Sequence, residues 1–406
     1  MKTCILTIGD ELLQGFTTDT NAAWLGKILH PYGIHIQKII TIGDDHDVII
    51  DETRKIIESN YNYLFVTGGL GPTHDDVTKK AFCKLFADEM YLDEDYFTKL
   101  KQKFERQLKN MPKINRSQAM LLKKADVIPN DAGSALGMHY LKHNTHVFIM
   151  PGVPDEMKEM VKNHIIPNYM KNEPVINQVT IKTVGIMESR LAEKIELLMK
   201  KYSRSFQFSF LPHYTGVSVR IRKNDKSKNL LRVKDDLFKA MQPYAYSFDN
   251  ESLEGVLAKK LIEKRLTIAV AESCTGGLIG KRLTDIAGSS NYFLGSITAY
   301  TNKLKTDLLG VSDNTLKQYG SVSKEVAINM AEGIRNNTHA DIGISTTGIS
   351  GPDGGSKEKP LGLVYIAIVT PETSKVKKYI FKVKRYIHRE MSATAALNIT
   401  RLFLEK

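Results

Sequence analysis

The sequence contains few cysteines and no long apolar run. Its 406 residues include three cysteines, Cys4, Cys83 and Cys274, which are scattered along the chain rather than paired. This spacing excludes a zinc site and a disulfide framework and predicts reduced thiols. No apolar stretch approaches a membrane-spanning length, and the opening run Cys4–Ile8 is too short for a signal peptide. We therefore expect a cytoplasmic protein without a membrane partner.

Low-complexity tracts and repeats of solenoid period are also missing. Apolar residues make up 42% of the chain and charged residues 25%, which is ordinary for globular proteins and excludes extensive disorder. The formal net charge of +12 is compatible with nucleic acid, with anionic small substrates or with no specific partner. The densest basic run, Lys375 to Arg389, alternates with apolar residues and is typical of the solvated face of a strand.

The chain is too long for a single hydrophobic core, so two or three domains are expected. Short apolar runs alternate with helical patterns from Cys4–Ile8 to Val147–Met150, and again from the helix predicted at Leu253–Lys264 onward. This rhythm predicts layered α/β folds, and the two blocks share no internal similarity. Between them, predicted strands Val179–Val184 and Val217–Arg222 alternate with helices. The predicted fold class is α/β, with two different three-layer α/β domains, 1–170 and 250–406, joined by a small α+β connector, 171–249.

The first candidate for a site in the C-terminal domain is the segment Ala271–Gly277. It lies between a predicted strand, Leu266–Val270, and a helix. A strand followed by small and hydroxylated residues and then a helix exposes backbone N–H groups toward an anion or oxyanion. Ser273 would lie beside these N–H groups, at the N-terminus of the predicted helix. The alternative is that Ser273 and Thr275 only cap the helix.

Two further loops belong to the same edge of the predicted sheet. Tyr300–Lys305 follows a predicted strand at Ile297–Ala299, and the glycine-rich segment Thr346–Ser356 follows another at Ile342–Ser345. Glycines permit positive φ and place consecutive N–H groups in a concave nest that suits a phosphate. We expect all three loops to meet at one sheet edge.

These segments resemble a known family. Ala271–Gly277, Ala299–Lys305, Gly320–Ser323 and Thr347–Ser356 match, in order and spacing, the C-terminal domain of the CinA family. That domain is similar to nicotinamide-nucleotide amidohydrolases, which convert nicotinamide mononucleotide and water to nicotinate mononucleotide and ammonia. The resemblance implies a hydrolase of pyridine-nucleotide salvage, with nicotinamide mononucleotide as substrate and no cofactor in this domain.

An amidase needs a nucleophile, a base, a proton for the departing ammonia and an oxyanion site. The predicted catalytic residues are Ser273 as nucleophile, Lys305 as its base, kept neutral by burial or by neighbouring positive charge, and Tyr300 as proton relay or as the residue that orients Lys305. Cys274 remains an alternative nucleophile, and Lys303 an alternative lysine, although the family pattern favours Lys305. The residues predicted to bind substrate, with phosphate and oxyanion roles left open, are Glu272, Thr275, Gly276, Gly277, Thr347, Gly348, Gly351, Gly354 and Gly355.

The sequence departs from the family pattern near its C-terminus. Val383 and Lys384 stand where a Gly-Asp pair is expected before the arginine at position 385. The resemblance therefore does not support a substrate role for Arg385 or Arg389.

The N-terminal domain contains two glycine-rich loops that follow strands. Gly9–Gly15 follows the first strand, and Thr67–Asp76 links the strand Tyr63–Val66 to the helix predicted at Val77–Phe86. Glycines and a helix N-terminus suit phosphates, while aspartates offer hard oxygen ligands to a divalent cation that bridges a diphosphate. The alternative is that Asp75 or Asp76 only caps the helix. The predicted nucleotide-binding residues are Gly9, Asp10, Glu11, Gly68, Gly69, Gly71 and Thr73, and the predicted ligands of the divalent cation are Asp10, Asp75 and Asp76.

Together with Asp19–Asn21, Asn115–Ala119 and Pro151–Met157, these loops resemble the molybdopterin-binding-like domain at the start of CinA proteins. The resemblance implies cleavage of the pyrophosphate of ADP-ribose, or of a similar nucleotide, with a divalent metal. Leu136 stands where a proline is usual in the family and Asp131 where one is common, which affects the expected fit of the substrate.

The middle segment resembles the connector of the family, which has a KH-like topology, through Gly185–Ser189 and Leu211-Pro212. It lacks the Gly-x-x-Gly loop that clamps nucleic acid, so nucleic acid is not an expected partner. The resemblance also implies a homodimer. Two other functions stay open: a non-catalytic adaptor in competence or DNA damage, and a pterin-binding protein of molybdenum-cofactor metabolism.

Overall fold

The computed structural model describes residues 2–73, 77–106, 110–170, 178–224, 228–249 and 251–405. Residue contacts divide the chain into two compact units, Met1–Ile176 and Asn177–Lys406. The domain junctions predicted after residues 170 and 249 each border a residue outside the described ranges, so these boundaries stay predictions. No helix in the described part of the chain combines the length and apolarity needed to cross a membrane.

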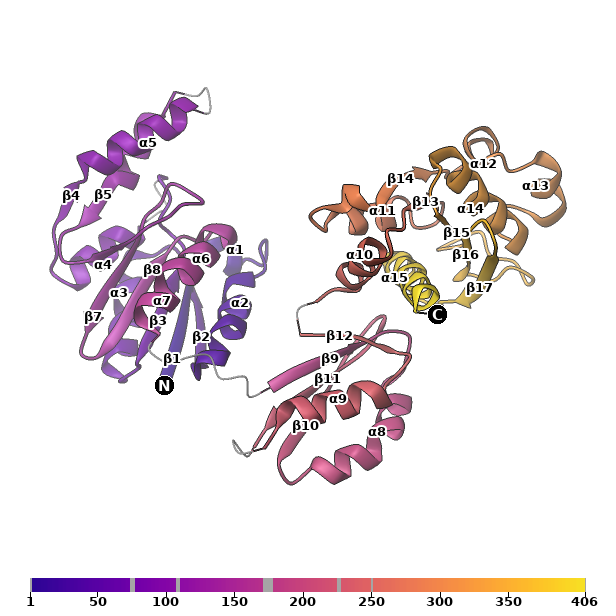
Figure 1. Ribbon diagram of the computed structural model, residues 1–406. Coiled ribbons are helices and arrows are strands. Elements are labelled where there is room, and N and C mark those ends of the chain that lie inside the picture. Colours follow the sequence, from indigo (N-terminus) through magenta and orange to yellow (C-terminus); the bar gives the residue numbers. More distant parts are fainter. Residues whose placement is uncertain are drawn as a thin grey trace. The chain divides into compact units, whose positions relative to one another are not determined.

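The first unit is built on a six-stranded sheet (Figure 1). Its strands are β1 (Lys2–Ile8), β2 (His35–Ile42), β3 (Tyr63–Thr67), β6 (Asp126–Ile128), β7 (Gly137–Lys142) and β8 (Thr145–Met150), and a separate hairpin pairs β4 (Met90–Leu92) with β5 (Met120–Leu122). Its helices are α1 (Asp10–Leu13), α2 (Thr20–Leu29), η1 (His30–Tyr32), α3 (His46–Glu58), α4 (Thr78–Leu85), α5 (Glu94–Arg106), η2 (Lys113–Ala119), α6 (Pro154–Met160), η3 (Val161–Ile165) and α7 (Ile166–Tyr169).

The six-stranded sheet is covered on both faces. Its order is β2-β1-β3-β8-β7-β6, parallel from β2 to β8 and antiparallel beyond. Alternate residues of a strand point to opposite faces. Leu6 packs with α3 and α4 on one face, while Ile5 packs with α2 and α6 on the other. The predicted three-layer α/β architecture is confirmed for this unit, and the loops after β1, β2, β3 and β8 meet at one sheet edge.

The segment between α4 and β7 had no predicted secondary structure. Helix α5 lies there, and the Tyr96 hydroxyl donates a hydrogen bond to the carbonyl of Ser134 (2.8 Å). Lys103 Nζ donates to the carbonyl of Gly133 (2.7 Å). Helix α5 therefore holds the loop around residues 130–136, which contains the departures from the family at Asp131 and Leu136.

The second unit begins with the connector. Its elements are β9 (Gln178–Thr183), α8 (Glu188–Tyr202), β10 (Phe206–His213), β11 (Gly216–Lys223), α9 (Leu230–Ala240) and β12 (Ala245–Phe248). The antiparallel sheet has the order β10-β11-β9-β12, and the two helices cover one face with Leu191, Ile195, Val233 and Leu237. This arrangement confirms the predicted small α+β connector.

The rest of the second unit is the C-terminal domain. Its elements are α10 (Leu253–Lys264), β13 (Ile268–Glu272), α11 (Leu278–Thr284), η4 (Ser289–Asn291), β14 (Phe293–Thr298), α12 (Asn302–Leu309), α13 (Asp313–Tyr319), α14 (Lys324–Thr338), β15 (Ile342–Gly348), β16 (Leu363–Val369), β17 (Ser374–Ile380) and α15 (Arg385–Leu404). The sheet order is β14-β13-β15-β16-β17, with β14, β13 and β15 parallel and β16 and β17 antiparallel.

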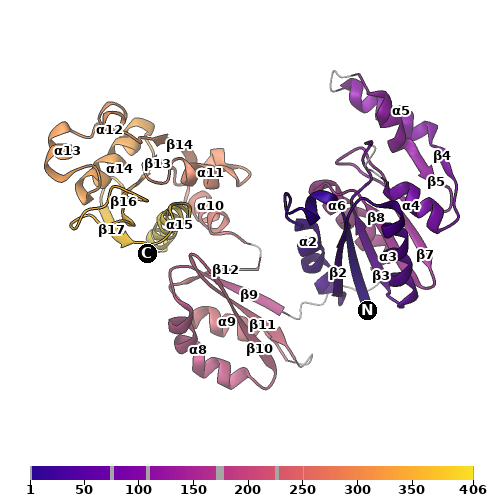
Figure 2. The same cartoon turned by 180° about the vertical axis from the view of Figure 1, so that it is seen from behind.

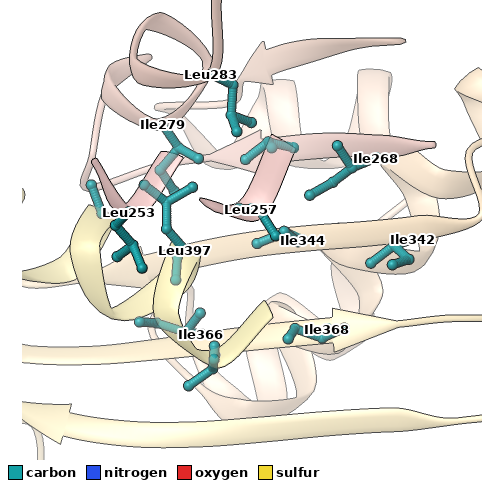
Figure 3. Packing of buried hydrophobic residues seen from close by; sticks show 14 of the residues in the cluster. Leu253, Leu257, Ile268, Ile279, Leu283, Ile342, Ile344, Ile366, Ile368 and Leu397 are labelled. Atoms are coloured by element: carbon teal, nitrogen blue, oxygen red, sulfur yellow. The ribbon is translucent and has the colours of Figure 1, made fainter. Parts of the chain in front are cut away.

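This second sheet is also the middle of three layers. Ile268 and Ile344 pack against α10, α11 and α15, as Figure 3 shows. Ala269 and Ala271 face the opposite way and pack against α14. Figures 1 and 2 show α15 and α14 on different sides of the sheet. The second predicted three-layer α/β domain is therefore confirmed.

Some predicted boundaries in this domain were wrong. The strand predicted at Leu266–Val270 runs from Ile268 to Glu272, because Arg265 takes a left-handed conformation (φ 54°) that ends α10. The strand predicted to end at Ser345 continues to Gly348, since it pairs with β16. The basic run from Lys375 is divided between the exposed edge strand β17 and the start of α15.

Candidate active site and nucleotide pocket

A small polar cavity of about 150 Å³ lies at the carboxyl ends of β13 and β15. The structure brings together there the three loops that were predicted to meet. Ser273, Lys305 and Tyr300 all contribute to the wall, as do Thr347 and Gly348. The remaining lining residues are Cys274, Asn302, Ser321, Val322, Ser350 and Arg385.

Ser273 and Lys305 are in direct contact. Lys305 Nζ lies 3.1 Å from Ser273 Oγ, 3.0 Å from the carbonyl of Ala299 and 3.5 Å from the carbonyl of Tyr300. Only 2% of the lysine is exposed, and this burial lowers the pKa of Lys305. In its neutral form the Lys305 amine would have two hydrogens for the two carbonyls and one lone pair that could accept the proton of Ser273.

The alternative residues Cys274 and Lys303 are placed less favourably. Cys274 packs in the apolar core, where burial raises the pKa of its thiol to about 12. A thiol is a strong nucleophile only as the thiolate, so this cysteine is held in its weakly reactive form. Lys303 is exposed, and its Nζ donates to Asp307 at 2.6 Å. The geometry favours Ser273 and Lys305.

Tyr300 contacts Lys305 through its backbone rather than its phenol. Its side chain is exposed, and its hydroxyl accepts a hydrogen bond from Arg385 Nη2 at 2.7 Å. Arg385 Nη1 donates to the carbonyl of Gly351 at 2.7 Å. Arg385 thus lies in the cavity wall, although the sequence did not support a substrate role for it. Arg389 instead donates to the carbonyl of Thr275 (2.8 Å) and supports the turn that carries Ser273.

Four residues predicted to bind substrate form that turn and do not line the cavity. The fully buried carboxylate of Glu272 accepts hydrogen bonds from the N–H groups of Ile279 (3.1 Å) and Gly280 (2.8 Å). The reason is electrostatic: a buried carboxylate needs donors, and the N-terminus of α11 supplies them. Thr275 Oγ1 forms a hydrogen bond with Thr346 Oγ1 (2.7 Å). The Gly276 N–H donates to the Ser273 carbonyl (3.1 Å), and Gly277 directly precedes α11.

The predicted glycine-rich loop is only partly at the cavity. Thr347 lines the cavity, and its Oγ1 donates to the carbonyl of Ser321 at 2.7 Å. Gly351 lies behind the wall and offers its carbonyl to Arg385. Gly354 and Gly355 are not part of the lining in the described residues. The roles predicted for Gly354 and Gly355 in binding a phosphate therefore stay predictions.

Because Glu272 caps α11 from a fully buried position, Glu272→Ala should destabilise the protein by about 2–3 kcal/mol by leaving two buried N–H groups without acceptors. Glu272→Gln should cost less, since its amide oxygen can still accept one bond. Thermal or denaturant unfolding measures both changes. Glu325, which lies in the first turn of α14 and is only partly buried, provides a control. An unchanged stability in Glu272→Ala would contradict the capping role.

A second, larger cavity of about 610 Å³ lies within the first unit. All seven residues predicted to bind a nucleotide line it: Gly9, Asp10, Glu11, Gly68, Gly69, Gly71 and Thr73. Gly68 has a positive φ of 114°, and a Cβ there would meet the carbonyl oxygen of Ile8 at 2.1 Å. Only glycine lets the loops after β1 and β3 approach so closely.

Acidic residues that the sequence did not single out also reach this second cavity. Asp44, which follows β2, accepts a hydrogen bond from the Asp10 N–H at 3.0 Å, and the Asp44 N–H donates to Asp10 Oδ1 at 3.3 Å. Glu156 of α6 lies in the wall and accepts from Asn130 Nδ2. The sequence did carry a signal for Asp44, because it follows the apolar run Ile36–Ile42 as Asp10 follows Cys4–Ile8.

The predicted metal ligands are described only in part. Asp75 and Asp76 lie outside the described residues, as does His74. Within the described ranges, no group of three or more His, Cys, Asp or Glu side chains is close enough together to hold a metal ion. Asp10 lies in the cavity wall, and its role as a ligand stays a prediction.

Comparison with known proteins identifies the family of this chain. Family models match residues 4–171 ("Probable molybdopterin binding domain"), 178–246 ("Damage-inducible protein CinA KH domain") and 250–404 ("CinA C-terminal domain"). A CinA-like protein of Chloroherpeton thalassium is 38% identical, with 98% of each chain covered. The chain belongs to the CinA family. A CinA-like protein of Salinibacter ruber is 35% identical over 99% of both chains.

Solved structures of the CinA family resemble parts of the chain. A competence/damage inducible protein of Agrobacterium tumefaciens is 37% identical and covers 38% of this chain and 96% of its own, with a TM-score of 0.35. A CinA protein of unknown function from Thermoplasma acidophilum is 31% identical and covers 42% of this chain and 97% of its own, with a TM-score of 0.38. The family membership, and with it the KH-like connector, agrees with the resemblance found in the motifs.

Proposed function

We propose that the C-terminal domain of this CinA protein hydrolyses the carboxamide of nicotinamide mononucleotide to nicotinate mononucleotide and ammonia, as a hydrolase of pyridine-nucleotide salvage. One observation carries the proposal. The buried amine of Lys305 lies 3.1 Å from the hydroxyl of Ser273. A lysine whose pKa burial lowers, in contact with a serine in a cavity, is a nucleophile with its base.

The first half of the reaction forms an ester on Ser273. Neutral Lys305 accepts the Ser273 proton while Oγ attacks the carboxamide carbon, which gives a tetrahedral oxyanion. The resulting ammonium of Lys305 keeps its bonds to the carbonyls of Ala299 and Tyr300. It transfers its third proton to the amide nitrogen, the C–N bond breaks, and ammonia leaves.

The second half returns the enzyme to its starting state. Lys305 is neutral again and accepts a proton from water, which attacks the ester carbon. The bond to Ser273 Oγ breaks, and Lys305 returns the proton to that oxygen. The sum is one amide and one water converted to one carboxylic acid and one ammonia, without a metal in this domain.

The size of the cavity and its charged rim support a pyridine nucleotide as substrate. A cavity of about 150 Å³ is the size that holds a single six-membered aromatic ring, and not a whole nucleotide. The exposed guanidinium of Arg385 lies at its wall, and guanidinium groups bind phosphates through paired N–H donors. The ring with its carboxamide would enter the cavity while the phosphate stays at the rim.

The test is release of ammonia from nicotinamide mononucleotide by the full-length protein, with equimolar formation of nicotinate mononucleotide. We expect turnover of the nucleotide and little turnover of free nicotinamide, which has no phosphate for the rim. If the purified protein releases no ammonia, the proposal is wrong and the alternative of a non-catalytic adaptor gains support.

We further propose that the N-terminal domain cleaves the pyrophosphate of ADP-ribose with a divalent cation. Five carboxylates line its cavity, and the described lining residues include neither lysine nor arginine: Asp10, Glu11, Asp19, Asp44 and Glu156. A diphosphate would be repelled by this charge unless a cation accompanied it. Oxygen ligands and phosphates together are the preferred surroundings of magnesium-like ions.

Removing the divalent cation should abolish cleavage of ADP-ribose and leave ammonia release unchanged, so each activity serves as the control for the other. In the same assay Asp44→Asn should lower ADP-ribose cleavage by at least about tenfold, because Asp44 holds Asp10 and adds charge to the cavity. Asp47→Asn is the matched control, since Asp47 lies on the surface and bonds Lys84. Full cleavage in the presence of a chelator would contradict the metal.

Binding of molybdopterin is the second candidate for this domain, because residues 4–171 match the molybdopterin-binding family. Calorimetry with ADP-ribose and with molybdopterin, each with and without a divalent cation, separates the two. We expect binding of ADP-ribose that depends on the cation. Tight binding of molybdopterin alone would favour the alternative.

A further inference from the structure

Ser350 and His388 form a hydrogen-bonded pair that the proposed mechanism does not use. Ser350 follows β15, is 8% exposed and lines the same cavity as Ser273. Its Oγ lies 2.9 Å from Nδ1 of His388, a fully buried residue of α15. The other ring nitrogen, Nε2, lies 3.1 Å from the carbonyl of Gly362. The two residues are far apart in the sequence and meet only in the fold.

The contacts of His388 fix the proton positions. The carbonyl of Gly362 can only accept, so Nε2 carries the hydrogen. Burial, chiefly, and the nearby charge of Arg385 lower the pKa of His388, so the ring is neutral at physiological pH. Its Nδ1 then has a lone pair and no hydrogen. The Ser350 hydroxyl must therefore donate to His388, and its oxygen presents only lone pairs to the cavity.

We infer that Ser350, oriented by His388, is the hydrogen-bond acceptor for the NH₂ group of the substrate carboxamide and selects the amide over the carboxylate. This inference rests on the proposed amidase function. An amide nitrogen offers two hydrogens, whereas a carboxylate has none and would place its lone pairs against those of Ser350. The oxygen and the NH₂ group of a carboxamide have nearly the same shape. The same contact therefore also fixes the orientation of the carboxamide, with its NH₂ group toward Ser350. Ser350 thereby favours the substrate and disfavours the product acid.

In a different role for the pair, Ser350 would be a second nucleophile and His388 its base. The surroundings of His388 oppose it, because accepting the Ser350 proton would create a buried imidazolium beside Phe381 and near Arg385. Its other partner is a neutral carbonyl rather than the carboxylate that stabilises an imidazolium in a catalytic triad. Turnover by a Ser273→Ala protein would reveal this role.

The test measures the affinities of the full-length protein for nicotinamide mononucleotide and nicotinate mononucleotide by calorimetry. Ser273→Ala serves as the background, so that the amide is bound and not converted. The quantity of interest is the ratio of the two affinities, amide over acid. Adding Ser350→Ala should lower this ratio by about tenfold, mainly through weaker binding of the amide.

Two further variants control for the loss of a buried hydroxyl as such and for poor folding of Ser350→Ala. Ser392→Ala removes a buried hydroxyl of α15, the helix that carries His388, and Ser392 is not part of the cavity lining, so the ratio should be unchanged. Ser350→Ala with His388→Phe removes both partners, which avoids an unsatisfied imidazole if Ser350→Ala alone folds poorly. It should give the same loss of selectivity as Ser350→Ala.

The outcomes separate this inference from the proposed function. If wild type releases ammonia and the ratio is unchanged by Ser350→Ala, the acceptor role is overturned and the amidase stands. If Ser273→Ala still releases ammonia while Ser350→Ala does not, Ser350 is the nucleophile and the acceptor role is overturned. If wild type neither binds nor converts the amide, the proposed function fails, and the inference fails with it.

Discussion

Ser273→Ala should lower kcat/KM for ammonia release from nicotinamide mononucleotide by about a thousandfold or more, because the covalent route is lost and only binding and oxyanion stabilisation remain. The nucleotide should still bind, since Ser273 is one small group in a cavity whose other walls are untouched. The loss should therefore appear in kcat rather than in KM. Steady-state kinetics with a coupled ammonia assay measure both parameters.

Cys274→Ser is the matched control for this prediction. Cys274 is the neighbouring residue and also reaches the cavity, but burial raises the pKa of its thiol to about 12. Serine has nearly the same size, so packing is little disturbed and activity should be retained. Activity lost in Cys274→Ser and kept in Ser273→Ala would reverse the assignment of the nucleophile.

Lys305→Met should lower kcat about as much as Ser273→Ala, roughly a thousandfold, because a serine hydroxyl without its base is a weak nucleophile. The double variant should be no worse than either single variant, since the two residues act as one unit. Methionine keeps the length and apolar character of the buried chain, so folding should not be impaired. Losses that multiply in the double variant would show that the two residues act independently.

The pH dependence of kcat/KM tests whether Lys305 acts in its neutral form. Lys305 acts as base only when neutral, and burial lowers its pKa below the ordinary value for lysine. In wild type, kcat/KM should therefore rise with pH through this lowered pKa and then level off. Lys303→Ala is the control: Lys303 lies two positions away, exposed and paired with Asp307, and its loss should leave the profile unchanged. A wild-type profile that falls with rising pH would contradict a neutral lysine base.

The sequence predicted the layers and the loops of this CinA protein well, because both depend on local pattern. Alternating apolar runs gave the two three-layer domains, and α10 begins and ends at the predicted residues, Leu253 and Lys264. Glycine and hydroxyl groups after strands predicted which loops meet at each sheet edge. Parallel strands bring their carboxyl ends to one edge whatever the details of packing.

The misplaced residues have identifiable physical reasons. Glu272 was expected at the substrate, yet it precedes Ser273 at the end of β13, where successive side chains point to opposite faces. With Ser273 in the cavity, Glu272 is directed to α11 instead. Period-two alternation within the strand could have shown this.

The roles of other members of the site could not be read from local pattern. Arg385 begins a helix well beyond the three loops, and the missing Gly-Asp pair argued against it, yet it bonds Tyr300 and Gly351. Ser350 lay within a matched motif but gained its role only through His388, a residue on α15. Contacts of this kind depend on how α15 packs on the sheet, which local pattern does not specify.

The most direct test of the central claim is a crystal structure of the Ser273→Ala protein with nicotinamide mononucleotide bound. We predict that the carboxamide carbon lies about 3–4 Å from the side chain of residue 273, within the range of a reactive approach, with Lys305 beside it. The amide nitrogen should face Ser350 and the phosphate should face Arg385. A carboxamide bound away from residue 273 and Lys305 would contradict the account.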